Sequence, residues 1–272
     1  MNKLVSGAIG VPVKITDTRI SLPDILELKG KRIKHIDFAD AVLQTVSGDN
    51  GVANVLPASS LSGAFLNLME QNTQEYKIKG MPLKNLALSV NYGNRPFINK
   101  IVDFPNSYID FPMLLQYPAL QDKIIFLVFW YDEPQIMQRI QEAGKTVIQN
   151  FEVDVFDTNF RKIGFGDNRT LTNKKFRNLF FHYLNGYGTT PAGKKLITLT
   201  DAQRSFITLQ RENLKFVRNV PVYLFYQVNN YYPVRLQNIT FDFLNSYIEV
   251  APAVSLQANS CFFFNAEIDD ND

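Results

Sequence analysis

The sequence predicts an all-β protein built from two copies of one module. Apolar segments of strand length recur along the 272 residues, separated by Gly, Asn, Asp and Pro. The composition agrees, because 22 Phe and 12 Tyr favour strands and the abundant Asn favours turns. Several short blocks also occur twice in the same order, which indicates an internal repeat. We therefore expect β-sandwich or barrel modules.

Ten segments have the alternating or continuously apolar pattern of strands. They are Gly63–Met69, Glu75–Ile78, Leu86–Tyr92, Tyr108–Phe111, Ile124–Tyr131, Phe151–Phe156, Phe206–Leu209, Val222–Val228, Ile239–Phe243 and Cys261–Ile268. The most apolar of them, Ile124–Tyr131, has about eight residues, whereas a transmembrane helix needs roughly 20. We expect it to be a buried strand.

One segment in the middle of the chain has the sequence pattern of a helix. Asp132 is a suitable N-cap, Pro134 lies near the first turn and Gly144 can end the helix. Ile136 and Ile140 would share its apolar face with Met137. This helix is expected to connect the two modules.

The internal repeat is the most informative feature of the sequence. The block Asn106–Asp110 reappears 139 residues later as Asn245–Glu249, and Pro82 matches Pro221 at the same offset. Further matches follow in the same order with slowly drifting offsets: Asp103-Phe104 with Asp242-Phe243, Phe65–Leu68 with Phe206–Leu209, and Gly30–Ile36 with Asn173–Leu179. The period is too long for a solenoid, so each unit should be a domain of about 130 residues. Two unrelated sandwiches with similar strand patterns are the alternative.

These offsets predict four segments. Residues 1–12 form an N-terminal arm or a frayed end, and residues 13–132 form the first β-module. Residues 133–148 form the connecting helix and linker, and residues 149–272 form the second module.

Charge and cysteine content limit the function classes. The 28 basic and 26 acidic side chains leave no surplus with which to bind nucleic acid. The single cysteine, Cys261, cannot form an intramolecular disulfide and lies in an apolar run that predicts burial. The first ten residues contain no apolar stretch of signal-peptide length, so no export is expected.

The residues needed for catalysis or metal binding are scarce, so we expect no enzyme, no cofactor and no metal. His35 and His182 occupy non-equivalent positions of the repeat, and one imidazole per module builds no metal site. The basic stretch around His35 fits a solvated strand face better than a nucleic-acid patch. Asp103 and Asp242 are equivalent, and we expect each to bond the turn before Asn106 and Asn245.

A duplicated β-module of this length resembles the double jelly-roll major capsid proteins of small icosahedral, lipid-containing bacteriophages such as the corticoviruses and finnlakeviruses. The repeated blocks carry this resemblance: Phe65–Leu68 with Phe206–Leu209, Pro82 with Pro221, and Asp103–Asp110 with Asp242–Glu249. The resemblance covers nearly the whole chain but rests on architecture and size, not on a signature motif. It implies two tandem eight-stranded jelly rolls joined by the short helix.

The resemblance also implies a function and a set of partners. The chain would be a structural virion protein whose homotrimers, with a pseudo-sixfold outline, tile an icosahedral shell. Its partners would be neighbouring capsomers, penton or spike proteins, minor capsid proteins and an internal viral membrane. It would reside in the virion, and in the host cytoplasm during assembly. The modules have little room for tower insertions, so a separate spike protein would bind the receptor.

Aromatic residues in two segments of the second module are the interface candidates. Tyr is favoured at interfaces, although packing in the core explains the same pattern. The candidates are Tyr223, Phe225, Tyr226, Tyr231 and Tyr232. Two other functions remain open: a minor virion component, such as a penton, tail or baseplate β-sandwich, and a two-domain carbohydrate-binding protein.

Overall fold

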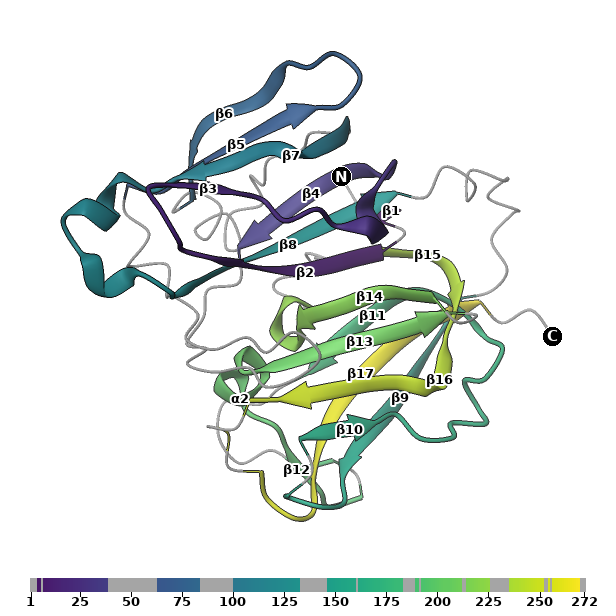
Figure 1. Cartoon of the computed structure of the whole chain (residues 1–272). Helices are drawn as coiled ribbons and strands as arrows, with labels where there is room; N and C mark the ends of the chain where they lie inside the picture. Colours follow the sequence, from purple (N-terminus) through teal and green to yellow (C-terminus); the bar gives the residue numbers. More distant parts are fainter. Residues whose placement is uncertain are drawn as a thin grey trace. The chain divides into compact units, whose positions relative to one another are not determined.

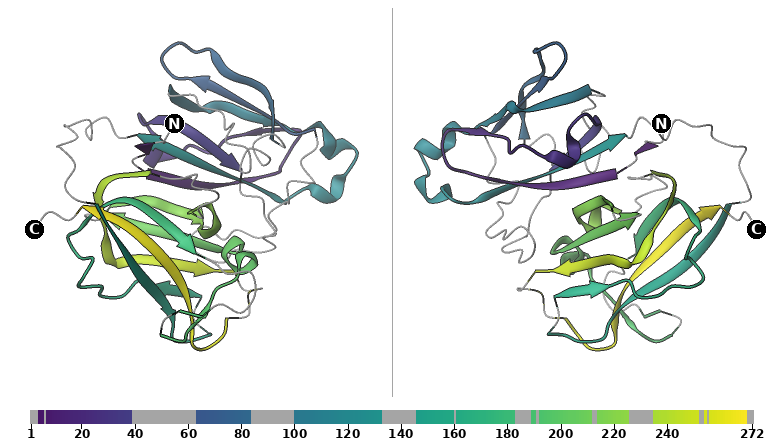
Figure 2. Two further views of the ribbon diagram at one scale, coloured as in Figure 1. Left: turned by 180° about the vertical axis from the view of Figure 1, so that it is seen from behind. Right: turned by 45° about the vertical axis from the view of Figure 1, so that its right-hand side comes forward.

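The fold was obtained as a computed structural model of the chain (Figure 1). It describes residues 4–5, 7–38, 63–83, 100–132, 146–159, 161–182, 189–190, 192–211, 214–225, 235–251, 254 and 256–269. Strands dominate this part of the chain, as the views in Figures 1 and 2 show. The predicted all-β class is therefore confirmed.

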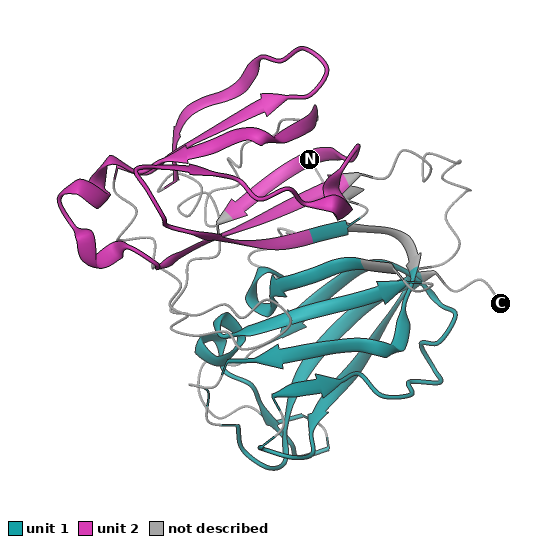
Figure 3. Cartoon of the chain, in the orientation of Figure 1, with its two compact units in different colours: residues 1–8, 135–272 teal, residues 9–134 magenta. Residues whose placement is uncertain are grey.

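The chain divides into two compact units (Figure 3). Unit 2 consists of residues 9–134, and unit 1 consists of residues 1–8 and 135–272. Residues 7–12 were expected in a free arm, and this is wrong. They belong to strand β2 (Gly7–Lys14), because Ile9, Val11 and Val13 alternate along it and are buried in the core.

Unit 2 contains two sheets that share a long strand. The shared strand is β7. The first sheet has the order β2–β8–β4–β7, in which only the start of β7 takes part, and the second has the order β3–β7–β5–β6. The strands besides β2 are β3 (Arg19–Ser21), β4 (Arg32–Phe38), β5 (Phe65–Glu70), β6 (Tyr76–Pro82), β7 (Lys100–Asp110) and β8 (Ile124–Asp132). Short 3-10 helices lie at Leu26–Leu28 (η1), Pro112–Leu115 (η3) and Pro118–Leu120 (η4).

Unit 1 has the same plan. β9, β17, β11 and β15 form one antiparallel sheet, and β10, β16, β13 and β14 form the other. Their bounds are β9 (Thr146–Val155), β10 (Lys162–Gly164), β11 (Lys175–His182), β13 (Ser205–Arg211), β14 (Leu214–Pro221), β15 (Arg235–Thr240), β16 (Asp242–Val250) and β17 (Ser260–Asp269). The two-residue strands β1 (Leu4–Val5) and β12 (Lys195–Leu196) add in parallel to β15 and β17.

Helix is scarce in the described residues. The α-helix α2 (Leu199–Gln203) begins at Thr198, whose Oγ1 accepts a hydrogen bond from the Asp201 amide. A 3-10 helix, η6 (Val222–Phe225), replaces the strand predicted at Val222–Val228, and the neighbouring strand β14 ends at Pro221 instead. The helix predicted within 133–148 lies largely outside the described residues, and Thr146–Ile148 already belong to β9.

The strand register repeats between the units at the offsets seen in the sequence. Phe65 pairs with Pro82 and Asp110 in unit 2, as Phe206 pairs with Pro221 and Glu249 in unit 1. The bulges coincide too: β4 is irregular between Ile33 and His35, and β11 between Phe176 and Asn178. The two units therefore share topology, register and irregularities.

Left-handed backbone positions repeat in the same way. Gly80 in β6 has φ +62°, and its equivalent Asn219 in β14 has φ +56°. The Gly80 amide donates to Asn67 Oδ1 at 2.8 Å, and the Asn219 amide donates to Thr208 Oγ1 at 3.2 Å. Asn tolerates this conformation better than other non-glycine residues, so both copies keep the same β-bulge.

The surplus of Phe is largely explained by the core of unit 1. Phe151 stacks on Phe264 with 5.3 Å between the ring centroids, and Phe176 stacks on Phe241 at 4.1 Å. Phe243 contacts several of these rings edge-on or tilted. Such aromatic pairs add to the hydrophobic stabilisation from burial.

Candidate functional site

The structure describes only two of the five predicted interface aromatics. Phe225 has no exposed surface in η6, so its assignment to an interface is wrong: a side chain buried in the core offers nothing to a partner. Tyr223 is partly buried in the same short helix. Tyr226, Tyr231 and Tyr232 lie outside the described residues.

The two equivalent aspartates behave as predicted. Asp103 accepts hydrogen bonds from the amide (3.4 Å) and side chain (2.9 Å) of Asn106, and Asp242 accepts the same bonds from Asn245 at 3.2 and 2.7 Å. Each carboxylate stabilises a short segment of its own unit, Asp103–Ser107 or Asp242–Ser246, which we call the corner of that unit. The role expected for both residues is therefore confirmed.

A buried serine completes each corner. Ser107 Oγ donates to the Asp103 carbonyl at 2.6 Å and accepts from the Met69 amide at 3.0 Å. Ser246 Oγ donates to the Asp242 carbonyl and accepts from the Gln210 amide at the same two distances. These bonds tie each corner to the neighbouring strand, β5 or β13.

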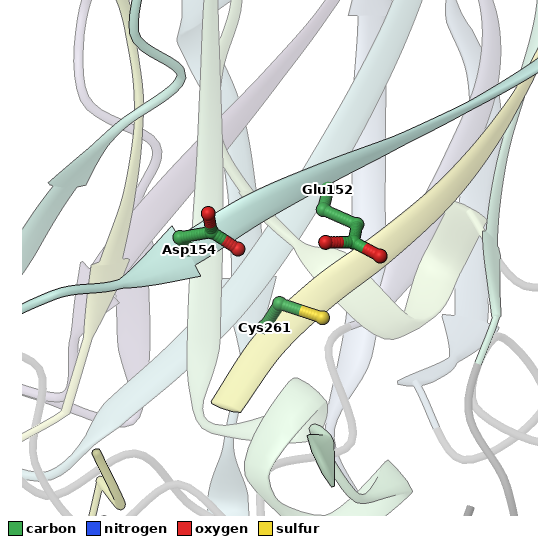
Figure 4. A group of neighbouring side chains, drawn as sticks. All are labelled: Glu152, Asp154 and Cys261. Atoms are coloured by element: carbon green, nitrogen blue, oxygen red, sulfur yellow. The ribbon is translucent and has the colours of Figure 1, made fainter. Parts of the chain in front are cut away.

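A polar cluster on unit 1 brings together one cation, two carboxylates and the thiol of the chain. Figure 4 shows the carboxylates of Glu152 and Asp154 beside the thiol of Cys261. Glu152 and Asp154 alternate along β9 with buried apolar residues, so they share the outer face of the sheet. Cys261 in β17 lies opposite Asp154 in the register. Lys194 Nζ lies 2.9 Å from Glu152 Oε2 and 2.7 Å from both carboxylate oxygens of Asp154.

The electrostatics of this cluster favour a structural ion pair. Burial raises the pKa of Glu152, but hydrogen bonds from Lys194 and Thr190 outweigh it and hold the pKa below its usual value. The two carboxylates raise the pKa of Lys194, Asp154 most strongly. A carboxylate oxygen of Glu152, one of Asp154 and the sulfur of Cys261 lie within 4.8 Å of one another, a spacing that could hold a metal ion, but the ammonium of Lys194 already supplies the positive charge there.

Cys261 is an inert thiol in this setting. It has no exposed surface, and burial together with the nearby negative charges of Glu152 and Asp154 raises its pKa to about 12. The thiol is therefore protonated at neutral pH, and because only the thiolate is a strong nucleophile, Cys261 is a poor nucleophile. The predicted burial of Cys261 is confirmed.

His35 belongs to a buried polar cluster in unit 2, whereas Arg32 in the surrounding basic stretch is exposed, Lys34 is partly exposed and Ile33 is buried between them, as expected for a solvated strand face. The exposed fraction of His35 is 1%, and its Nε2 lies 3.0 Å from Asp37 Oδ1. Trp130 Nε1 donates to Asp37 Oδ2 at 2.5 Å. The positions equivalent to His35 and Trp130 in unit 1 hold Asn178 and Glu267, which are also hydrogen-bonded to each other. The cluster around His35 is buried and hydrogen-bonded, so it stabilises the sheet.

The outer faces of the sheets β3–β7–β5–β6 and β10–β16–β13–β14 carry equivalent aromatic and charged residues. Arg19 stacks over the Tyr108 ring at 4.4 Å and bonds to Asp110 at 3.1 Å. At the equivalent place, Lys162 Nζ lies 3.7 Å from the centroid of the Tyr247 ring. These are cation–π contacts at the same register position of each unit.

Large apolar side chains are exposed in both units. Scattered single examples are common on protein surfaces, whereas clustered ones mark interaction sites. In the described residues they are Leu26, Leu115, Tyr117, Ile148, Phe156 and Leu244. Leu115 is the last residue of η3 and Tyr117 immediately precedes η4, so this short segment of unit 2 is a candidate contact point.

Comparison of the chain with protein-family models, curated proteins and solved structures found no match. Among the described residues, none of the helices has the length and apolar character needed to span a membrane.

Proposed function

We propose that this chain is the major capsid protein of a small icosahedral, lipid-containing bacteriophage and that its two units are jelly rolls. The observation that carries the proposal is the strand order. If the strands of unit 1 are lettered in chain order from B (β9) to I (β17), omitting β12, its sheets read B–I–D–G and C–H–E–F. This is the arrangement that two Greek keys produce in an eight-stranded jelly roll.

Unit 2 supports the same assignment. β2, β3, β4, β5, β6 and β8 take the places of B, C, D, E, F and I, and the long strand β7 takes those of both G and H. The hydrogen bonds at the corner serines fall at the G–H boundary in both units. Two modules alike in such detail favour duplication over convergence.

Duplication suits a shell protein for a geometric reason. Two similar modules in one chain let a threefold homotrimer present six near-equivalent edges, which a hexagonal lattice requires. Folding each module into two packed sheets also shields strand edges that would otherwise aggregate at high concentration. The proposed location is therefore the virion, with neighbouring capsomers, penton or spike proteins, minor capsid proteins and an internal membrane as partners.

The experiment is a mass measurement of the purified chain by native mass spectrometry and light scattering. The proposal predicts a trimer, three times the chain mass of 31.1 kDa, that assembles further at high concentration. A pentamer would favour a penton-type minor component. A monomer that binds glycans on an array would favour the carbohydrate-binding alternative and would refute the capsid proposal.

A further inference from the structure

The outer face of the sheet that contains β9 and β17 is covered at one end only. Every second residue of β17 lies on this face. From the end of the strand to its start, these residues are Glu267, Asn265, Phe263 and Cys261. The first three are partly exposed, whereas Cys261 has no exposed surface. Another segment therefore covers the start of β17.

The adjacent strand β9 shows the same change in exposure. Ile148 is 65% exposed, whereas the side chains of Glu152 and Asp154 are 20% and 23% exposed. Ile148 pairs with Glu267, and Asp154 pairs with Cys261. The covered ends of the two strands therefore coincide, and they carry the two carboxylates and the thiol seen in Figure 4.

The covering segment consists of residues 192–196, which we call the strap. Its strand β12 pairs in parallel with the start of β17, which β9 also pairs with, so β12 and β9 lie on opposite edges of β17. Lys194 Nζ nevertheless lies 2.7 Å from both carboxylate oxygens of Asp154 and 2.9 Å from Glu152 Oε2. The Lys194 side chain therefore crosses β17 at Cys261 and shields the thiol from solvent.

The ion pairs of Lys194 join the strap to β9. β12 has only two residues, so its backbone pairing with β17 is short. The Ile197 amide donates to the Cys261 carbonyl at 3.0 Å, and the Thr190 amide donates to the Lys194 carbonyl at 2.8 Å. Segments with so few contacts open locally at a low free-energy cost. The charge of the two carboxylates therefore determines how often the strap opens.

We propose that the strap is an acid-released cover: protonation of Glu152 and Asp154 frees Lys194, the strap leaves the outer face, and the Cys261 thiol becomes accessible. The hydrogen bonds from Lys194 and Thr190 hold the pKa of Glu152 below its usual value, so their stabilisation is present at neutral pH and is lost as the pH falls through the lowered value. The other titratable groups of the described residues on this face are Cys261, which stays protonated, and His182 at the end of β11.

His182 has to be separated from the carboxylates because it also gains a proton in acid. Its ring contacts Phe263 edge-on, two residues from Cys261, and burial lowers its pKa. The structure gives no ion pair between His182 and the strap. Removal of His182 should therefore leave the acid release unchanged.

The reactivity of Cys261, the single cysteine of the chain, measures whether the strap is closed. The reagent is 4,4′-dithiodipyridine, which reacts with thiols at acidic as well as neutral pH. The rate for the unfolded chain in urea, divided by the rate for the folded chain at the same pH, gives the protection of the thiol. We expect protection to fall about tenfold between about pH 7 and about pH 3 while far-UV circular dichroism stays native, since a covered thiol reacts only when its cover opens.

Three variants separate the strap from other causes. Lys194→Met should lower the protection about tenfold at neutral pH, with no further loss in acid, because the strap has already lost its ion pairs. The matched control is Lys195→Met, since Lys195 is exposed and bonds to Gln257 at 3.0 Å. This control and His182→Gln should keep the protection and the acid release of the wild type.

Four results would overturn the strap. They are equal protection in Lys194→Met and wild type at neutral pH, protection that does not change on acidification, loss of the acid release in His182→Gln, and labelling that rises only as the circular dichroism signal is lost.

Discussion

Removal of the corner serines is the sharpest test of the equivalence of the two units. Ser107 is 0% exposed and Ser246 is 1% exposed, and each hydroxyl makes one bond as donor and one as acceptor at matching distances. In Ser107→Ala the Met69 amide loses its acceptor, and in Ser246→Ala the Gln210 amide does. An unsatisfied buried donor costs about 1–3 kcal/mol, so each variant should lower the free energy of unfolding by that amount.

The chain contains its own reporter for separating the two effects. Trp130 is the only tryptophan and is buried in unit 2, so its fluorescence follows that unit, whereas circular dichroism follows both. In urea titrations, Ser107→Ala should move the fluorescence transition and Ser246→Ala the transition of unit 1. The double variant should equal the sum to within about 0.5 kcal/mol, because the sites share no partner.

The control for this experiment is Ser21→Ala, an exposed serine on β3 that should change stability by less than about 0.5 kcal/mol. A corner variant that behaves like this control would show that the serine bonds do not stabilise its unit. Losses that differ between the two units by more than about 1.4 kcal/mol, a tenfold difference in equilibrium constant, would show that the corners are not equivalent.

Three further substitutions test individual features. Lys194→Met should cost about 1–2 kcal/mol at neutral pH. The lowered pKa of Glu152 gives stability that is present above the usual carboxyl pKa and is lost as the pH falls through the lowered value, so the gap between the variant and wild-type unfolding curves should narrow on acidification, and a pH-independent gap would contradict this. Asp37→Ala removes the acceptor of two buried donors and should lower the free energy of unfolding, measured by thermal denaturation, by about 2–4 kcal/mol. A loss below about 1 kcal/mol would show that the cluster does not stabilise the fold. Gly80→Asn should be nearly neutral in urea unfolding because Asn219 has the same conformation, whereas Gly80→Val should cost about 1–2 kcal/mol, and equal effects would disprove the strain argument.

Strands with a strong apolar pattern could be predicted from the sequence. Ile124–Tyr131 is continuously apolar and forms the central strand β8, buried on both faces. Strand β2 was missed because its glycines and the chain end suggested an arm, although Ile9, Val11 and Val13 alternate along it. Val222–Phe225 has strand propensity but folds as a 3-10 helix, because the strand with the matching register ends at Pro221.

The polar contacts could be predicted where their partners lie close in sequence and could not where their partners lie far apart. The corner bonds of Asp103 and Asp242 span three residues and recur in the repeat, so the sequence could predict them. The Lys194 cluster joins segments 40 or more residues apart, and no local pattern predicts such a contact. The alternation of Glu152 and Asp154 with apolar neighbours was the available signal, since it places both carboxylates on one face of β9.

Electron microscopy of the purified oligomer tests the capsid proposal most directly. Two jelly rolls in each of three chains predict particles with threefold symmetry and six similar lobes around the axis. A two-lobed particle of single-chain mass, or a ring of a different order, would contradict the proposal.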